Sequence, residues 1–267
     1  MTREEQILSA TIQDKCRLAE KRGIPVHTGF LTPAEANFAE AVCRAEGVFP
    51  AGRGGSGTEY LLDGGYEDAD RRICVLFPSG PDGFRTEESP EPSDRFLCVL
   101  KVSVPKGSKL LTHRDYLGSL LGLGVERSVA GDILVRENGA DIIVLRDMAD
   151  YLAQNLTSVG RAQVSVSVAE LSELDLGQQR TEEYRDTVAS LRLDSVAASA
   201  FRLARGKAQD AIRAGLVSVN GRQVEKPDAE LSEGDRISLR GKGKAVLSEV
   251  GGRTRKDRIA VVITRYL

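Results

Sequence analysis

The sequence predicts an α+β protein that contains more than one small domain. Two helices are expected near the N-terminus, strands and helices alternate in the middle of the chain, and two short helices followed by a hairpin are expected toward the C-terminus. A chain of 267 residues has room for two or three small domains, and 41% hydrophobic with 28% charged residues is the composition of a soluble globular protein.

The first region, residues 1–94, is predicted to begin with a pair of helices. Apolar residues recur at mostly helical spacing over residues 3–22, and Gly23 is expected to stop that helix. The second helix starts with Thr32 as N-cap, a proline at the first helical position and Glu35 closing a capping box, and Gly47 is expected to end it. Its inward face is predicted to consist of Phe38, Val42 and Ala45.

The segment at residues 51–65 is rich in glycine, which leaves a phosphate-binding loop and a surface turn as alternatives. A phosphate-binding loop needs a strand before it, a GK[ST] sequence and a helix directly after it, and this segment has none of the three. The sequence therefore favours a plain surface turn around Gly52, Gly54, Gly55 and Gly57.

The central region, residues 95–170, has the element order of a ferredoxin-like sandwich. A strand at residues 73–77 and a loop at residues 78–94 precede it. Within the region the predicted order is strand, helix, strand, strand, helix, strand. These elements are expected at residues 96–104, 113–123 with Thr112 as cap, 132–136, 140–145 after an Asn138-Gly139 turn, 148–156 with Asp147 as cap, and 162–168.

This architecture is shared with RNA-recognition motifs, whose strands present aromatic residues for base stacking. Residues 141–145 are aliphatic apart from their first residue, and Phe96 is the only aromatic residue on the first strand. The fold alone is therefore weak support for an RNA-binding role of the central region.

The C-terminal region is predicted to follow a polar linker at residues 171–190. Asp194 is expected to be the N-cap of a helix that runs to about residue 203, and a second helix over residues 205–214 is expected to end at Gly215. The next two strands, at residues 216–219 and 222–224, should be joined through the favourable turn dipeptide Asn220-Gly221.

Three further strands are expected at residues 236–239, 245–250 and 259–266. Lys242 and Lys244 are predicted to lie in a glycine-spaced loop before the second of these strands. Residues 251–258 are predicted to form a basic turn before the third.

The helix, helix, hairpin order resembles the S4 RNA-binding domain. The resemblance rests on Arg192-Leu193-Asp194, Arg205, Ala208, Ile212, Gly215, Val217, Val219-Asn220-Gly221 and Gly234-Asp235. S4 domains usually have a serine before the arginine that opens the second helix. This chain has Ala204 there, so we expect that helix to lack a hydroxyl cap.

Other segments resemble the YlmH-like family of bacterial S4-domain proteins. They are residues 112–132, Gly64-Gly65-Tyr66 with Arg71-Arg72, and the closing GKGKAVLSEVGGRTRKDR. The resemblance implies an N-terminal helical and α/β region (1–94), a central RRM-like domain (95–170), a linker (171–190) and an S4 domain with a β extension (191–267). It also implies ribosomal RNA and the large ribosomal subunit as partners, tRNA as a further one, and a role in translation quality control or rescue of stalled peptidyl-tRNA complexes.

Charge is distributed unevenly along the chain. Residues 191–267 contain 16 Lys or Arg and 9 Asp or Glu, a net charge of +7, whereas residues 1–190 carry −9. A surplus of this size on a short domain attracts phosphate backbones, while the acidic remainder opposes indiscriminate coating of nucleic acid.

Several functional classes are disfavoured by the sequence. No apolar run approaches the length of a membrane span, and the N-terminus lacks the apolar core of a secretory signal. The four cysteines have no CxxC spacing, and His27 and His113 are the only histidines, so neither a metal site nor a cofactor is expected. We expect a cytoplasmic protein.

The candidate RNA-binding residues are basic or polar side chains of the S4-like region. Arg205 and Lys207 rank first among them, because a helix that opens onto a phosphate adds its amide dipoles to the side-chain charges. Since aromatic residues are few, structured RNA is favoured over single strands. The full set is Arg192, Arg202, Arg205, Lys207, Gln209, Arg213, Arg240, Lys242, Lys244, Arg253, Arg255 and Lys256.

Two other classes of function stay open. An S4-containing enzyme of pseudouridine-synthase type would use the aspartate of an Arg-Leu-Asp motif, here Asp194, but the residues ahead of it are too few for the catalytic domain. His113-Arg114-Asp115 imitates a kinase triplet without the other kinase motifs. An adaptor for protein partners, linked to cell division, would use the acidic front of the chain. The interpretation that we favour is a non-enzymatic RNA-binding protein.

Overall fold

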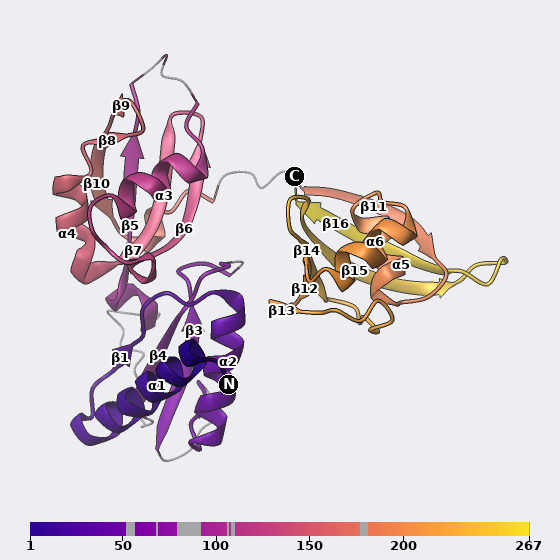
Figure 1. Ribbon diagram of the computed structural model, residues 1–267, viewed down its shortest axis with the longest axis horizontal. Coiled ribbons are helices and arrows are strands. Elements are labelled where there is room, and N and C mark those ends of the chain that lie inside the picture. Colours follow the sequence, from indigo (N-terminus) through magenta and orange to yellow (C-terminus); the bar gives the residue numbers. More distant parts are fainter. Residues whose placement is uncertain are drawn as a thin grey trace. The chain divides into compact units, whose positions relative to one another are not determined.

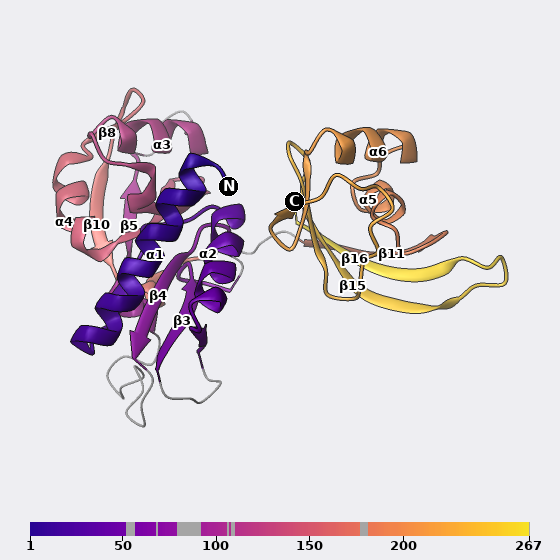
Figure 2. The same ribbon diagram turned by 60° about the horizontal axis from the view of Figure 1, so that its bottom comes forward.

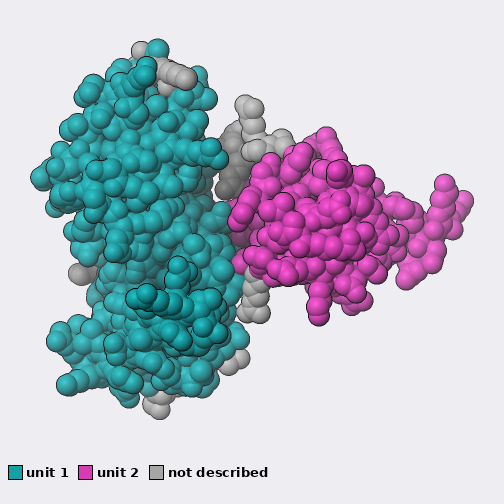
Figure 3. All heavy atoms as spheres, viewed as in Figure 1, with its two compact units in different colours: residues 1–176 teal, residues 177–267 magenta. Residues whose placement is uncertain are grey.

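The computed structural model describes residues 1–51, 57–67, 69–78, 92–105, 107, 110–176 and 181–266, without the side chains of Pro92, Ser93 and Arg222. The chain divides into two compact units, residues 1–176 and residues 177–267 (Figure 3). Helices and strands occur together in both units, so the chain is a mixed α+β protein (Figure 1). Of the glycines considered for a phosphate loop, Gly52, Gly54 and Gly55 lie outside the described residues.

The N-terminal part of unit 1 is a four-stranded sheet with two helices on one face. The helices α1 (Arg3–Arg22) and α2 (Pro33–Ala45) pack against β3 and β4 (Figure 2). The strand order is β1-β4-β3-β2. The bounds are β1 (Val26–His27), β2 (Phe49–Pro50), β3 (Thr58–Asp63) and β4 (Ile73–Pro78).

Local signals in the sequence set the helix ends correctly. Gly23 ends α1 in the left-handed conformation, at φ 64°, and the capping box of Thr32 and Glu35 is present. The predicted inward face of α2 was right only in part: Val42 packs against the core, but the buried residues are Ala36, Ala39 and Cys43. These small side chains allow α2 to approach its neighbours closely, whereas the bulkier Phe38 and Val42 are only half-buried and Ala45 is exposed.

Three cysteine thiols meet in this core. Cys16 of α1, Cys43 of α2 and Cys74 of β4 are all buried, and the thiol of Cys43 hydrogen-bonds with those of Cys16 and Cys74. The hydrogen bond with Cys43, together with burial, raises the pKa of Cys16 far above its usual value. The cysteines that are scattered in the sequence are therefore buried core residues.

The prediction of a surface turn over residues 51–65 is wrong for residues 58–63. These residues form β3, which pairs with β4 from Thr58 opposite Pro78 to Asp63 opposite Ile73. The glycines around this segment concealed the strand, because its own residues, TEYLLD, alternate only weakly in polarity.

The central part of unit 1 has the predicted alternation of strands and helices. Its sheet has the order β10-β5-β7-β6, and all neighbours in it are antiparallel. Asp147 lies within the first turn of α4 and Leu145 is the N-cap, so the predicted cap was two residues late. The bounds are β5 (Leu97–Ser103), α3 (His113–Leu121), β6 (Ala130–Arg136), β7 (Gly139–Leu145), α4 (Arg146–Asn155), β8 (Ser158–Val159), β9 (Ala162–Gln163) and β10 (Ser165–Ala169).

Both faces of this central sheet are covered. On one face, Tyr116 and Leu120 of α3 and Leu152 of α4 pack onto the strands. On the other, Ile143 and Leu97 pack against residues of β4 in a second apolar cluster that joins the two sheets of unit 1. Leu171 and Leu174 also pack against this cluster, so the segment after β10 helps to close the second face.

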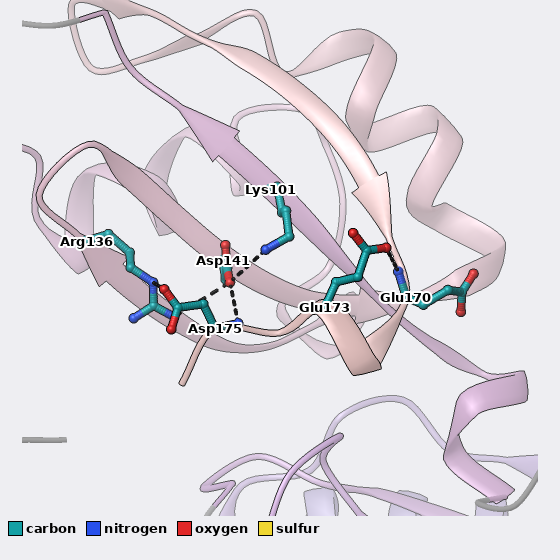
Figure 4. Close-up of polar contacts among 6 residues, drawn as sticks. All are labelled: Lys101, Arg136, Asp141, Glu170, Glu173 and Asp175. Carbon is teal, nitrogen blue, oxygen red and sulfur yellow. Dashed lines mark hydrogen bonds and ion pairs between the residues drawn. The ribbon is translucent and has the colours of Figure 1, made fainter. Parts of the chain in front are cut away.

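A polar cluster continues this closure (Figure 4). Asp141 of β7 is buried, and its carboxylate lies 3.4 Å from Lys101 Nζ and 3.6 Å from Arg136 Nη2. It also accepts a 3.0 Å hydrogen bond from the backbone amide of Asp175. Arg146 anchors the start of the same segment through Glu170 at 2.5 Å. The segment at residues 170–176 therefore lies fixed along the sheet, with the short helix η3 (Leu171–Glu173) inside it.

Unit 2 is a six-stranded sheet of order β11-β16-β15-β14-β12-β13, with α5 and α6 packed on one face. Asn220 and Gly221 have φ values of 50° and 77°, so the predicted turn is confirmed. The bounds are β11 (Thr181–Val188), α5 (Leu193–Ala200), α6 (Arg205–Arg213), β12 (Val217–Val219), β13 (Arg222–Gln223), β14 (Arg236–Leu239), β15 (Gly243–Arg253) and β16 (Ile259–Tyr266).

The sequence predicted that residues 181–188 belong to a linker, and this prediction is wrong. They form β11, which pairs with β16 from Thr181 opposite Tyr266 to Val188 opposite Ile259. The prediction failed because an edge strand with one solvated side is mostly polar, and only Tyr184 and Val188 supply apolar contacts to the core.

We predict that Gly139→Ala destabilises unit 1 by at least about 1 kcal/mol. Gly139 has φ 148°, and a Cβ there would lie 1.9 Å from the carbonyl oxygen of Val102. Gly118→Ala is the matched control, since Gly118 lies on the exposed side of α3 with open space around it, and the variant should gain about 0.5 kcal/mol. Calorimetric unfolding of the two full-length variants measures both effects, and equal stability of the two would contradict the close approach at Gly139.

Candidate nucleic-acid interface

The S4-like helix pair is organised around the side chain of Asp194. Asp194 was predicted to be an N-cap, and this is wrong: Arg192 is the N-cap residue of α5, and Asp194 lies in the first turn with 0% exposure. Its carboxylate accepts hydrogen bonds from Arg205 Nε at 3.0 Å, Arg205 Nη2 at 3.1 Å and Gln209 Nε2 at 2.6 Å. A buried carboxylate needs such partners, and α6 supplies them.

The charge of Asp194 depends on these contacts. Burial alone would raise the pKa of Asp194, but the hydrogen bonds from Arg205 and Gln209 and the nearby Arg192 outweigh burial and hold the pKa below its ordinary value of 3.8. The stabilisation that this carboxylate provides is therefore complete above its ordinary pKa and is lost as pH falls through the lower folded-state value. Unit 2 keeps this ion pair throughout the neutral range.

The predicted RNA-binding residues around Asp194 and on α6 fall into two groups, those that contact Asp194 and those that are exposed without such a contact. Arg205 and Gln209 use their polar groups inside the protein, and Arg192 Nε lies 3.4 Å from the same carboxylate. Lys207 and Arg213 are exposed on α6 and have no ion pair among the described residues. Ala204 is the N-cap residue of α6 and makes no side-chain cap, as predicted.

A groove of about 510 Å³ lies beside this pair of helices, between α5, β11 and the start of β16. Three guanidinium groups line it, from Arg202, Arg205 and Arg258. Arg202 pairs with Glu182 at 2.5 Å and lies 5.7 Å from the ring centroid of Tyr184. The other polar groups along the groove include the side chains of Asp186, Thr187, Ser195 and Ser199.

Arg258 lines the groove but was not among the RNA-binding residues predicted from the sequence. Its side chain donates a 2.9 Å hydrogen bond from Nε to Thr187 Oγ1 and a second hydrogen bond from Nη2 to the carbonyl oxygen of Thr187. Since β11 was taken for a linker, no sequence signal connected residue 258 with residue 187. Only the pairing of β11 with β16 brings Arg258 to the groove.

The remaining basic residues fall into two groups at opposite ends of β15. Arg253, at the end of the strand, pairs with Asp257 at 2.5 Å. Arg255 and Lys256 are exposed in the turn between β15 and β16, at the tip of a hairpin (Figure 2). Arg240 and Lys242 are exposed in the turn that precedes β15, while Lys244 is half-buried within the strand rather than in a loop.

The length of β15 separates these two groups. At about 3.3 Å per residue, the strand places the groups on the order of 30 Å apart. The hairpin tip that carries Arg255 and Lys256 leads into Arg258 along the chain, with Asp257 between them. We define the groove and tip surface as Arg202, Arg205, Arg255, Lys256 and Arg258.

This arrangement is suited to binding phosphate groups. Arginine side chains and hydroxyl groups along an open groove provide hydrogen-bond donors for phosphate oxygens. Among the described residues, no group of three or more His, Cys, Asp or Glu side chains is placed to hold a metal ion. No helix in the described part of the chain is long and apolar enough to cross a membrane.

Comparisons with known proteins agree with the division of the chain into unit 1 and unit 2. Residues 90–173 match the family model described as an RNA-binding domain in YlmH, and residues 191–237 match the S4 domain. The chain is 37% identical, over 238 residues, to the ribosome-associated protein quality control protein P2 of Bacillus subtilis strain 168. This alignment covers 89% of the chain and 86% of that protein.

A solved structure supports the fold of a large part of the chain. The cell division protein ylmH from Streptococcus pneumoniae superposes with a TM-score of 0.50 at 20% identity, and the match covers 65% of this chain and 95% of that one. At this identity the likeness concerns the fold alone.

We predict that Asp194→Asn lowers the free energy of unfolding of unit 2 by about 3 kcal/mol, because it leaves Arg205 without its buried counter-charge. Asp210→Asn is the control, since Asp210 is exposed on α6, the helix that carries Arg205, and its loss should change stability by less than about 0.5 kcal/mol. Urea unfolding followed by hydrogen exchange of unit 2 peptides separates the two. An Asn variant as stable as the parent protein would restore the capping role.

Proposed function

Because this chain belongs to the YlmH family, with its RNA-binding domain and S4 domain, we propose that it binds structured ribosomal RNA and acts in ribosome-associated protein quality control. The observation that carries the proposal is the groove and tip surface of unit 2. Its exposed positive charge comes from Arg255 and Lys256, while Arg202 and Arg205 are paired with Glu182 and Asp194 and belong to the frame of the groove. Rigid placement of the donors lowers the entropic cost of docking on folded RNA.

The large ribosomal subunit is the partner we propose, with rescue of stalled peptidyl-tRNA complexes as the task and tRNA as a further contact. The name of the relative in Bacillus subtilis supports the ribosomal setting. The charge split supports a bounded site, because a basic domain docks on phosphate while the acidic remainder, with a charge of −9 over residues 1–190, is repelled from further RNA. A cytoplasmic location follows from this role.

We also propose a three-domain division. Residues 1–94 form the N-terminal domain and residues 95–170 a ferredoxin-like, RRM-like domain, whose strand order β10-β5-β7-β6 supports the assignment. The S4 domain is proposed at residues 191–267, with β11 added to its sheet. In an RNA-recognition motif, one face of the sheet stacks bases. The corresponding face of the central sheet is covered here by β4 and by the segment at residues 170–176, which favours unit 2 as the RNA-binding part.

A non-enzymatic role is part of the proposal. The enzyme alternative would require a catalytic aspartate at Asp194, whose carboxylate has no exposure and three close donors. Asp115, in the kinase-like triplet, accepts hydrogen bonds from the amide and hydroxyl of Thr112, the N-cap residue of α3, and so closes the capping box of that helix. An adaptor role in cell division is the remaining alternative, and it predicts association without RNA.

We predict that Arg255→Glu with Lys256→Glu weakens binding to a structured ribosomal RNA fragment at least about tenfold, or about 1.4 kcal/mol. Since two phosphate contacts are removed, the slope of log affinity against log salt should decrease by roughly 1.5 to 2. Lys21→Glu with Arg22→Glu, at the exposed end of α1, is the control of equal charge change. Fluorescence anisotropy at several salt concentrations measures the RNA affinity and its salt dependence. Equal losses of affinity in the two double variants would mean that net charge alone, and not the hairpin tip, determines binding.

Arg205 requires a separate test because it is part of the buried ion pair. We predict that Lys207→Glu alone reduces RNA affinity without changing the stability of unit 2, whereas Arg205→Glu lowers both, since it leaves Asp194 uncompensated. Urea unfolding and RNA titration of the two single variants separate the roles. Loss of RNA affinity in neither variant would exclude the start of α6 from the interface.

Sedimentation of cell lysate through a sucrose gradient tests the partner. We expect the protein in the fraction of free large subunits at moderate salt, and at the top of the gradient at high salt or after Arg255→Glu with Lys256→Glu. Association that survives ribonuclease treatment would favour the adaptor alternative. Exclusive migration with small subunits, or no ribosomal association at any salt concentration, would contradict the proposal.

A further inference from the structure

Two segments that resemble the YlmH-like family, residues 64–72 and 112–132, take no part in the interface of unit 2. In the fold of unit 1 they meet at Asp132 of β6. Its carboxylate accepts hydrogen bonds from Tyr66 Oη at 2.8 Å, from the amide of Asp70 at 2.7 Å and from the amide of Arg71 at 3.2 Å. Loop and strand are therefore held in a fixed relation.

This junction brings two arginine side chains together. Arg71 donates from Nη2 to the carbonyl oxygen of Phe30 at 2.8 Å, and Arg127 donates from Nη2 to that of Gly131 at 3.0 Å. The two acceptor residues touch, because a Cβ on Gly131 would lie 2.5 Å from the ring of Phe30. The guanidinium groups of Arg71 and Arg127 therefore bind to neighbouring backbone carbonyls, although the two residues are 56 positions apart in the chain.

Neither arginine has an ion pair within the described residues. Their donors are directed at backbone carbonyl oxygens, which carry only partial charge, and Arg71 Nε is buried with no acceptor. The nearest carboxylates, Glu35 and Asp132, are engaged elsewhere, Glu35 in the capping box of α2 and Asp132 with the groups named above. The hydrogen bonds described above use only some of the N–H donors of each guanidinium group, so donors stay available to an anion beside the two carboxylates.

The pKa shifts point in the same direction. Burial and the proximity of Arg71 lower the pKa of Arg127 to about 10, although Asp132 acts against this, and burial lowers the pKa of Arg71. His113, exposed at the start of α3, has a pKa lowered by burial and by Arg127. Each of these groups would gain free energy from a nearby anion.

We propose that Arg71, Arg127 and His113 form a binding site for a phosphate group on unit 1. The site goes beyond the RNA interface of unit 2. Arg71 and Arg127 are half-buried residues whose guanidinium groups provide donors for phosphate oxygens, and the exposed His113 adds a further donor when its imidazole is protonated. The phosphate belongs either to an RNA backbone or to a small phosphorylated compound, which present the same chemistry.

His113 allows this site to be observed directly, because the chain contains only two histidines. In proton NMR of the full chain at constant ionic strength, we expect inorganic phosphate, but not chloride, to raise the pKa of His113 and to leave His27 unchanged. Arg127→Gln should raise the pKa of His113 in the absence of phosphate and weaken the phosphate response about tenfold or more. Arg161→Gln, an exposed arginine outside the site, should change neither.

His27 also reports whether unit 1 is folded, since its ring lies 4.5 Å from that of Phe96. If Arg127→Gln shifts His27, the same titration is made with Arg71→Lys, which keeps the charge and should retain the phosphate response in weaker form. Titration with adenosine monophosphate, and with an RNA hairpin on the Arg255→Glu, Lys256→Glu background, distinguishes the two sources of phosphate. A His113 resonance that responds equally to phosphate and chloride, or a full response in Arg127→Gln, would overturn the proposal, whatever the outcome for unit 2.

Discussion

The buried contact between Asp194 and the α6 side chains Arg205 and Gln209 is the interaction on which unit 2 depends. A carboxylate without exposure is unfavourable unless its charge is compensated, so α5 and α6 must keep one relative position. That position sets the wall of the groove and the direction of Arg202 and Arg205. Arg205 in this way shapes the surface that we propose as the RNA interface.

The contact also explains why local and long-range features differ in how well a sequence predicts them. The capping box at Thr32 and Glu35 and the turn at Asn220-Gly221 depend on residues a few positions apart, so the sequence contains them completely. Asp194 has the sequence context of a cap, but its environment depends on residues 11 and 15 positions further on. Arg258 and β11 depend on a pairing across about 70 residues, and no local pattern predicts it.

The candidate site was predictable in part for the same reason. Composition identified the basic region, and the hairpin-tip residues Arg255 and Lys256 are exposed as a charged turn requires. The side chains that share a groove, and those that lie at the far end of β15, are distinguished only by the sheet register. The four-strand order of the central domain was predictable, whereas the covering of its second face required the apolar residues of β4 and the segment that holds Asp175.

Positive charge has a different setting in the two units. In unit 2, Arg255 and Lys256 extend into solvent from a turn, where their contribution to binding is long-ranged and sensitive to salt. In unit 1, Arg71 and Arg127 are half-buried beside backbone carbonyls, where a bound anion would interact at short range and with little screening. The acidic composition of the front of the chain therefore does not describe the local potential at every point of its surface.

The cysteine core of the N-terminal domain gives the chain an intrinsic reporter of its own integrity. All four cysteines lie at or before residue 98 and all are buried, while residues 177–267 contain none. Thiolate is the reactive form, and burial together with the contact between Cys16 and Cys43 keeps the Cys16 thiol protonated. A thiol-directed dye added to the native protein thus has no ready target, and the rate at which it labels the chain measures how often unit 1 opens, with no signal from unit 2.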